Sequence, residues 1–141
     1  MEPHDTRPTR VRPLQPRGIG APLGHLSNAT RVGNRLYVAG LVSIDEGGEV
    51  VGPGSVREQT LQICSMLKAI CTQYGGDLTS VARCLVFLTD PELYREYDTA
   101  FAEAFGEYRP ARATVIAQLV SQEFLIEIVS DVELPDESGG H

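Results

Sequence analysis

Two charged residues inside apolar segments are the first candidates for chemistry in this sequence. Arg112 lies within residues 111–117 and Glu127 within residues 124–129. In such β-type segments, a charge that faces inward needs a partner or a function. If the two segments pair as strands, the guanidinium and the carboxylate could meet in one cleft. The arginine would then hold a substrate carboxylate through two hydrogen bonds, and the glutamate would orient or deprotonate a water.

The same two residues also fit a purely structural interpretation. Arg112 and Glu127 could form an ion pair that only stabilises the fold, or each could face solvent from its own strand. Ion pairs of this kind are common in proteins that have no site at that place. The periodicity of the two segments leaves both interpretations open.

Composition limits the class of protein. The 141 residues suit a single domain, and 42% hydrophobic with 22% charged residues is ordinary for a globular chain. The net charge of −7 argues against nucleic-acid binding, which needs a basic face. No apolar run approaches the length of a membrane span, so we expect a soluble, cytoplasmic protein without a membrane partner.

The cysteines and histidines do not suggest a metal site. Cys64, Cys71 and Cys84 stand in apolar surroundings and are typical of reduced core thiols. A zinc site would need clustered cysteine and histidine ligands, which the sequence lacks. We therefore expect no metal.

The two ends of the chain differ in composition from the middle. Residues 1–20 are rich in proline and arginine and indicate a flexible tail, whereas residues 136–141 are acidic and glycine-containing and indicate a disordered one. Residues 21–135 should form the domain.

Within the domain, hydrophobic spacing and turn residues predict seven elements. Ser55 and Glu58 form a capping-box pattern at the start of the first helix, and Asp90 followed by Pro91 marks the start of the second. The expected elements are strands at 28–32 and 35–43, a helix from 56 to 74, a strand at 81–88, a helix from 91 to 105, and strands at 111–117 and 124–129.

This order, ββαβαββ, predicts an α+β domain with two helices packed on one face of a mixed sheet. The other face of the sheet must also be covered. Small domains often cover such a face by oligomerising, which creates clefts between subunits.

Several of these segments resemble the Rid family of reactive intermediate deaminases, also called YjgF-type proteins. The similarity extends from about residue 21 to residue 134, and its most specific part is Pro110-Ala111-Arg112 followed by Glu127 in an Ile-Glu-Ile strand. The resembling segments are 32–40, the helix that contains Gln59, 86–90, 110–115 and 126–128. The resemblance implies a chorismate-mutase-like fold and a homotrimer with three clefts between subunits.

The resemblance also implies an activity and roles for residues. Arg112 would bind the substrate carboxylate, Thr114 would lend backbone groups to the ligand, and Glu127 would orient the hydrolytic water. The implied reaction is that of a 2-iminobutanoate/2-iminopropanoate deaminase-like hydrolase, which converts small carboxylate-bearing enamines or imines to 2-oxo acids and ammonia. No cofactor is needed, because an imine carbon is already electrophilic.

The chain departs from the family pattern at positions that line the implied cleft. Leu26 replaces a tyrosine, Ala113 replaces a serine, and Ala39-Gly40-Leu41 stands where the family has Ser-Gly-Gln, which places Gly40 at the substrate. Each change makes the site less polar. The resemblance places Phe87 near the cleft as well, although its apolar strand also suits a core residue.

These departures leave two other functions open. The chain could be a pathway-specific catalyst of specialised metabolism that acts on a larger, more apolar substrate. Alternatively, it could be a non-catalytic module in which Arg112 binds a small carboxylate such as a 2-oxo acid or merely bridges subunits.

Overall fold

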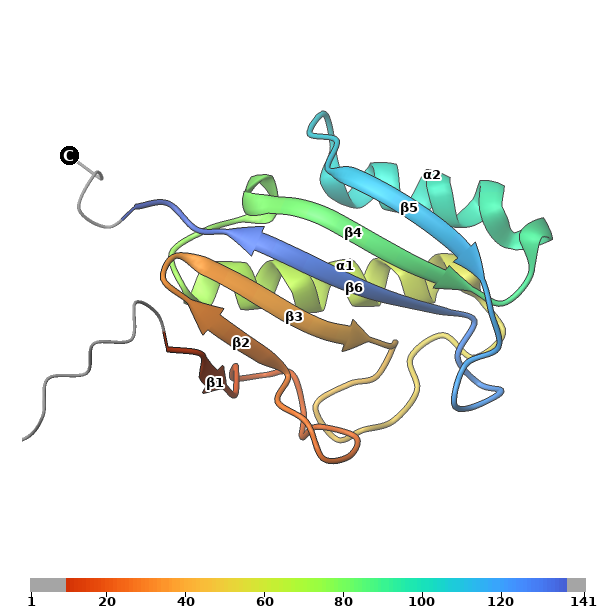
Figure 1. The fold of residues 1–141 in the computed structure, drawn as a ribbon. Helices are drawn as coiled ribbons and strands as arrows, with labels where there is room; N and C mark the ends of the chain where they lie inside the picture. Colours follow the sequence, from red (N-terminus) through yellow and green to blue (C-terminus); the bar gives the residue numbers. More distant parts are fainter. Residues whose placement is uncertain (1–9, 137–141) are drawn as a thin grey trace, which may run out of the picture.

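The computed structural model describes residues 10–136, which form a six-stranded mixed sheet with two helices on one face (Figure 1). The strand order is β1-β2-β3-β6-β4-β5, and the pairing is antiparallel except between β4 and β5. The elements are β1 (Arg12–Leu14), β2 (Ala29–Val32), β3 (Arg35–Leu41), α1 (Val56–Gln73), η1 (Leu78–Ser80), β4 (Val81–Leu88), η2 (Pro91–Leu93), α2 (Tyr94–Phe105), β5 (Ala111–Ile116) and β6 (Ile126–Glu133). The predicted α+β fold, with two helices on one face of a mixed sheet, is confirmed.

Helix α1 begins and ends as its sequence predicts. The Ser55 hydroxyl accepts a hydrogen bond from the backbone N–H of Glu58, and Gly75 follows the helix with a φ of 91°, which favours glycine. Its apolar stripe is buried against the sheet. Two polar residues, Gln59 and Thr60, are buried with it. The fully buried Gln59 side chain donates to the carbonyls of Gly52 and Glu123 and accepts from the N–H of Leu125, so it ties two loops to α1.

The strand register separates the sheet into two faces. On β4, Cys84, Val86 and Leu88 are buried on the helix side, whereas Leu85 and Phe87 alternate with them and are only half-buried. Phe87 therefore lies on the face opposite the helices and not in the core.

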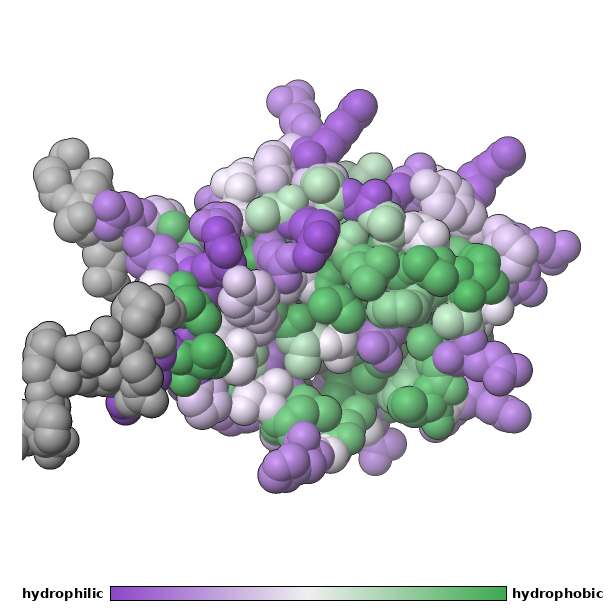
Figure 2. All heavy atoms as spheres, in the orientation of Figure 1, coloured by the Kyte–Doolittle hydropathy of each residue, from purple (hydrophilic) through white to green (hydrophobic). Residues whose placement is uncertain are grey.

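The face of the sheet opposite the helices is open and partly apolar. Leu85 lies beside Val129 of β6, and Phe87 lies beside Val115 of β5. Figure 2, in which this face points toward the viewer, shows hydrophobic side chains gathered across it. A contiguous apolar surface of this kind marks an interaction site. As expected from the sequence, this face is not covered by the helices that the structure describes.

The prediction that residues 1–20 form a flexible tail is wrong for the second half of this segment. Residues 12–14 form β1 and pair with β2, and Ile19 is buried in the core. The Arg17 backbone N–H donates to Gln73 Oε1, and the Gln73 amide donates back to the Arg17 carbonyl. The chain thus joins the fold at Arg12. Residues 1–9 and 137–141, which include the first nine residues of one predicted tail and all but one residue of the other, lie outside the described part.

Candidate active site

Arg112 lies on β5 and points toward helix α2. Its Nη2 donates to Asp98 Oδ1 at 2.7 Å and to the Tyr94 hydroxyl at 3.0 Å. The guanidinium carbon lies 4.7 Å from the centre of the Phe101 ring and 4.9 Å from that of Tyr97. Stacking on aromatic rings suits the planar guanidinium and fixes its orientation. The charge of Arg112 is therefore held firmly in an aromatic setting.

The electrostatic setting keeps this guanidinium charged. Burial alone lowers the pKa of Arg112, but the hydrogen bond to Asp98 and the nearby tyrosines outweigh it, so the net pKa is raised. Burial also raises the pKa of Tyr97 to about 12, and its hydroxyl lies 2.8 Å from Thr114 Oγ1. The Thr114 side chain is thus engaged with α2. The role implied for Thr114 uses backbone groups, and β5 is an edge strand whose outer backbone groups have no strand partner among residues 10–136.

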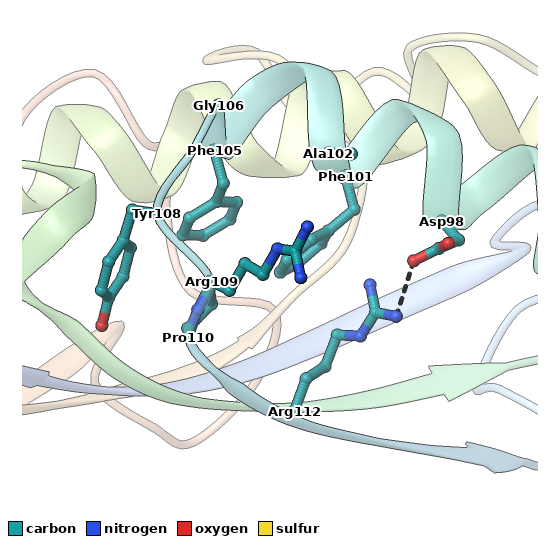
Figure 3. Close-up of a pocket in the computed structure, with 9 residues that line it drawn as sticks. All are labelled: Asp98, Phe101, Ala102, Phe105, Gly106, Tyr108, Arg109, Pro110 and Arg112. Carbon is teal, nitrogen blue, oxygen red and sulfur yellow. Dashed lines mark hydrogen bonds and ion pairs between the residues drawn. The ribbon is translucent and has the colours of Figure 1, made fainter.

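A pocket of about 490 Å³ opens next to Arg112, between α2 and the segment that leads into β5 (Figure 3). Apolar walls come from Phe101 and Phe105, whose rings stack with centres 4.4 Å apart, and a second cation comes from Arg109. The remaining lining residues are Asp98, Ala102, Gly106, Tyr108 and Pro110. The pocket combines positive charge with aromatic surface, which suits a carboxylate that carries an apolar group.

Glu127 lies on β6 in the open face of the sheet. It is the register partner of Phe87, and it packs so closely against Gly40 of β3 that a Cβ atom at residue 40 would lie 2.2 Å from Glu127 Oε2. Within residues 10–136, no hydrogen bond or ion pair to its carboxylate is found. Burial raises the pKa of Glu127 above the ordinary glutamate value, because desolvation disfavours the charged form. A raised pKa makes this carboxylate a better base.

The two segments that carry Arg112 and Glu127 do not pair as strands, because β4 lies between β5 and β6, so the two side chains do not meet within one chain. Arg112 is the register partner of Cys84, and Glu127 is the register partner of Phe87. Cys84 and Phe87 are three residues apart on one strand, so their side chains point to opposite faces. A structural ion pair between Arg112 and Glu127 is absent within the chain as well, where the ionic partner of Arg112 is Asp98.

Leu26 and Gly40 lie near each other beside β3, away from the β5 edge that carries Arg112. Both line a small pocket of about 60 Å³, which core residues such as Ile19 and Met66 also border. Leu26 is half-exposed there. The structure thus groups Gly40 with Glu127, Phe87 and Leu26 on or near the open face, and groups Arg112 and Thr114 on the helix side. The candidate residues therefore lie in two separate groups, which we call the two half-sites.

Asp98, Tyr94 and Arg109 are candidate site residues that the sequence did not indicate. A signal was nonetheless present for the two residues of α2, because Tyr94, Tyr97, Asp98 and Phe101 follow the spacing of one helix face. Among residues 10–136, histidine, cysteine, aspartate and glutamate side chains form no group of three that could hold a metal ion. No helix in the same range is both long and apolar enough to cross a membrane.

Comparison with known families matches nearly the whole described chain. The model of the family described as Endoribonuclease L-PSP matches residues 18–134. A RutC family protein of Sulfurisphaera tokodaii is 36% identical over 107 residues, which cover 76% of this chain and 86% of the relative. The 3-aminoacrylate deaminase RutC of Acinetobacter baylyi is 37% identical over 117 residues, covering 83% and 93% of the two chains.

Solved structures agree with this match. RidA from an Antarctic Psychrobacter superposes with a TM-score of 0.76 at 30% identity and covers 83% of this chain and 94% of its own. Yeast Mmf1 has the same fold, with a TM-score of 0.81 at 21% identity over 89% of this chain and all of its own. The predicted resemblance to Rid proteins is confirmed.

Proposed function

Because the chain belongs to the endoribonuclease L-PSP family, together with the Rid and RutC proteins, we propose that it hydrolyses small imines and enamines that carry a carboxylate. The specific substrates we propose are 2-iminopropanoate and 2-iminobutanoate. One relative is named a 3-aminoacrylate deaminase, which supports this class of chemistry.

The observation that carries the proposal is the separation of two complementary half-sites. Arg112 lies on the edge strand β5, and Glu127 lies on an open, apolar face that needs a cover. If a second copy covers that face with its β5 edge, Arg112 of one copy comes near Glu127 of the next. We therefore propose a homotrimer in which each cleft takes one half-site from each of two subunits.

In such a cleft each residue has a defined task. Arg112 would hold the substrate carboxylate, and Glu127 would accept a proton from the water whose oxygen attacks the imine carbon. Glu127 would return this proton to the nitrogen of the tetrahedral adduct, which in a protonated imine already carries two hydrogens. As the C–N bond breaks, Glu127 would take up the proton of the adduct's hydroxyl, so that ammonia leaves and the carbonyl of the 2-oxo acid forms. The raised pKa of Glu127 favours this transfer, because a base with a pKa nearer neutrality can both accept and return the proton.

The test is an assay in which the imine is generated in place and release of the 2-oxo acid is followed above the spontaneous rate. We expect Arg112→Ala to abolish both activity and binding of 2-oxobutanoate, and Arg112→Lys to keep the charge but lose most of the rate. Glu127→Gln should bind normally and turn over ~10²- to 10⁴-fold more slowly. Arg57→Ala is the matched control, because it removes an arginine that pairs with Glu103 on the helical surface.

A wild-type protein with no acceleration would exclude these substrates. If it also failed to bind any small carboxylate by calorimetry, the role of Arg112 would be wrong. Binding without turnover would instead support the non-catalytic module.

A second candidate differs only in the size of the substrate. The pocket of about 490 Å³ beside Arg112 has aromatic walls at Phe101 and Phe105 and exceeds what a three-carbon imine needs. This observation favours a pathway-specific catalyst that accepts a larger, apolar side chain. Measuring kcat/KM for the imines of pyruvate and phenylpyruvate decides between the two candidate functions. A substrate pocket with aromatic walls should give the phenylpyruvate imine the higher kcat/KM, whereas a site for small imines should favour the pyruvate imine.

A further inference from the structure

The hydrogen-bonding edge of Arg112 is already occupied within its own chain. Nη2 has two hydrogens, and they are used by Asp98 Oδ1 at 2.7 Å and the Tyr94 hydroxyl at 3.0 Å. A carboxylate can grip a guanidinium with two prongs across Nε and Nη2 or across Nη1 and Nη2. Both edges include Nη2, so a substrate carboxylate must displace one of these two acceptors.

Of the two acceptors, Asp98 is the charged one, so its displacement breaks the ion pair with Arg112. The Arg112 side chain is only 17% exposed and is stacked on two rings, whereas the Asp98 side chain is 51% exposed on the surface of α2. The guanidinium is therefore the fixed partner, and the aspartate can turn into solvent at little cost. Tyr94 is neutral, so its displacement leaves the charge of the site unchanged.

A displaced Asp98 stays close to the bound ligand and keeps its negative charge. A plain anion, such as a 2-oxo acid, meets repulsion from Asp98 once it has taken Arg112. A protonated imine that carries a carboxylate is a zwitterion, with its cation next to the carboxylate. It can exchange partners with the ion pair, placing its carboxylate on Arg112 and its cation toward Asp98.

We propose that Asp98 is a specificity-determining residue that makes the Arg112 subsite favour zwitterionic iminium carboxylates over the 2-oxo acid product. This inference rests on the proposed function, because it assigns Arg112 to the substrate carboxylate. Selectivity here comes from an element that disfavours the wrong ligand as well as one that attracts the right one.

The test is Asp98→Asn, which keeps the shape and removes the charge. We expect 2-oxobutanoate to bind about fivefold more tightly to Asp98→Asn by calorimetry, as expected for removing one like charge a few ångströms away in a partly solvated site. The KM for the imine should stay the same or rise, so product inhibition should become stronger relative to substrate binding.

Two matched variants isolate the cause. Tyr94→Phe removes the other acceptor without changing charge and should leave the ratio of product affinity to KM unchanged. Glu103→Gln removes the same charge from the same helix, where the carboxylate pairs with the exposed Arg57, and should change neither quantity.

Weaker binding of 2-oxobutanoate to Asp98→Asn, or an unchanged ratio, would overturn the inference and leave Asp98 as a residue that positions Arg112. The proposed function would still stand in that case, provided that wild-type binding depends on Arg112. Absence of Arg112-dependent binding in the wild type would instead refute both.

Discussion

Replacing Gly40 with alanine tests the position of Glu127 without changing Glu127 itself. The added Cβ would lie 2.2 Å from Glu127 Oε2 and 2.8 Å from its Cδ, whereas ordinary contacts begin near 3.4 Å. The carboxylate must therefore move by about 1 Å, and a misplacement of that size can cost roughly 10²-fold in rate. Gly40 does not have a positive φ, so alanine strains only this contact.

We expect Gly40→Ala to lower kcat for imine hydrolysis by about 10²-fold. The free energy of unfolding should change by less than ~1 kcal/mol, because the end of a flexible side chain can give way. Release of the 2-oxo acid measures the first quantity and urea denaturation the second. Gly47→Ala is the control, since its Cβ would meet only Asp45 Oδ1 at 3.4 Å in a turn. Full activity in Gly40→Ala would refute the assigned position or role of Glu127.

Three further predictions concern stability, each measured by chemical denaturation. Burial raises the pKa of Glu127 in the folded state above 4.5, so the ionised side chain opposes folding. Glu127→Gln should therefore be more stable than wild type at pH 7. This difference in the free energy of unfolding should vanish as the pH falls below 4.5, where Glu127 is protonated in the unfolded chain too. Gln59→Leu removes three buried hydrogen bonds and should cost about 3 kcal/mol, against ~1 kcal/mol for Gln62→Leu, which removes one; equal losses would contradict the role of Gln59. Deleting residues 1–19 removes β1 and the buried Ile19 and should cost about 2–3 kcal/mol, whereas an unchanged stability would show that β1 contributes nothing.

Local signals were sufficient to predict both helices and the fold class. The Ser55 cap, the apolar stripe of α1 and Gly75 each act within a few residues, so the sequence shows them directly. The short strand β1 escaped prediction, because three residues that include Pro13 give no periodicity.

The face on which each site residue lies could not be read from the sequence. In β5, small or apolar residues occupy both alternating sets, so the pattern does not show whether Arg112 faces the helices. The insertion of β4 between β5 and β6 is a long-range pairing that no local spacing encodes. Asp98 was hidden for a related reason, since a charge on a helix surface is ordinarily solvated.

Complementation between two inactive variants is the most direct test of whether Arg112 and Glu127 act from different subunits. Arg112→Ala and Glu127→Gln chains would be mixed in equal amounts under conditions that allow subunits to exchange. A cleft is intact when Glu127→Gln supplies Arg112 and Arg112→Ala supplies Glu127. Random mixing makes roughly one cleft in four intact, so about a quarter of wild-type activity should return. Activity no higher than that of either variant alone, in a mixture shown to have exchanged subunits, would show that Arg112 and Glu127 do not act from different subunits.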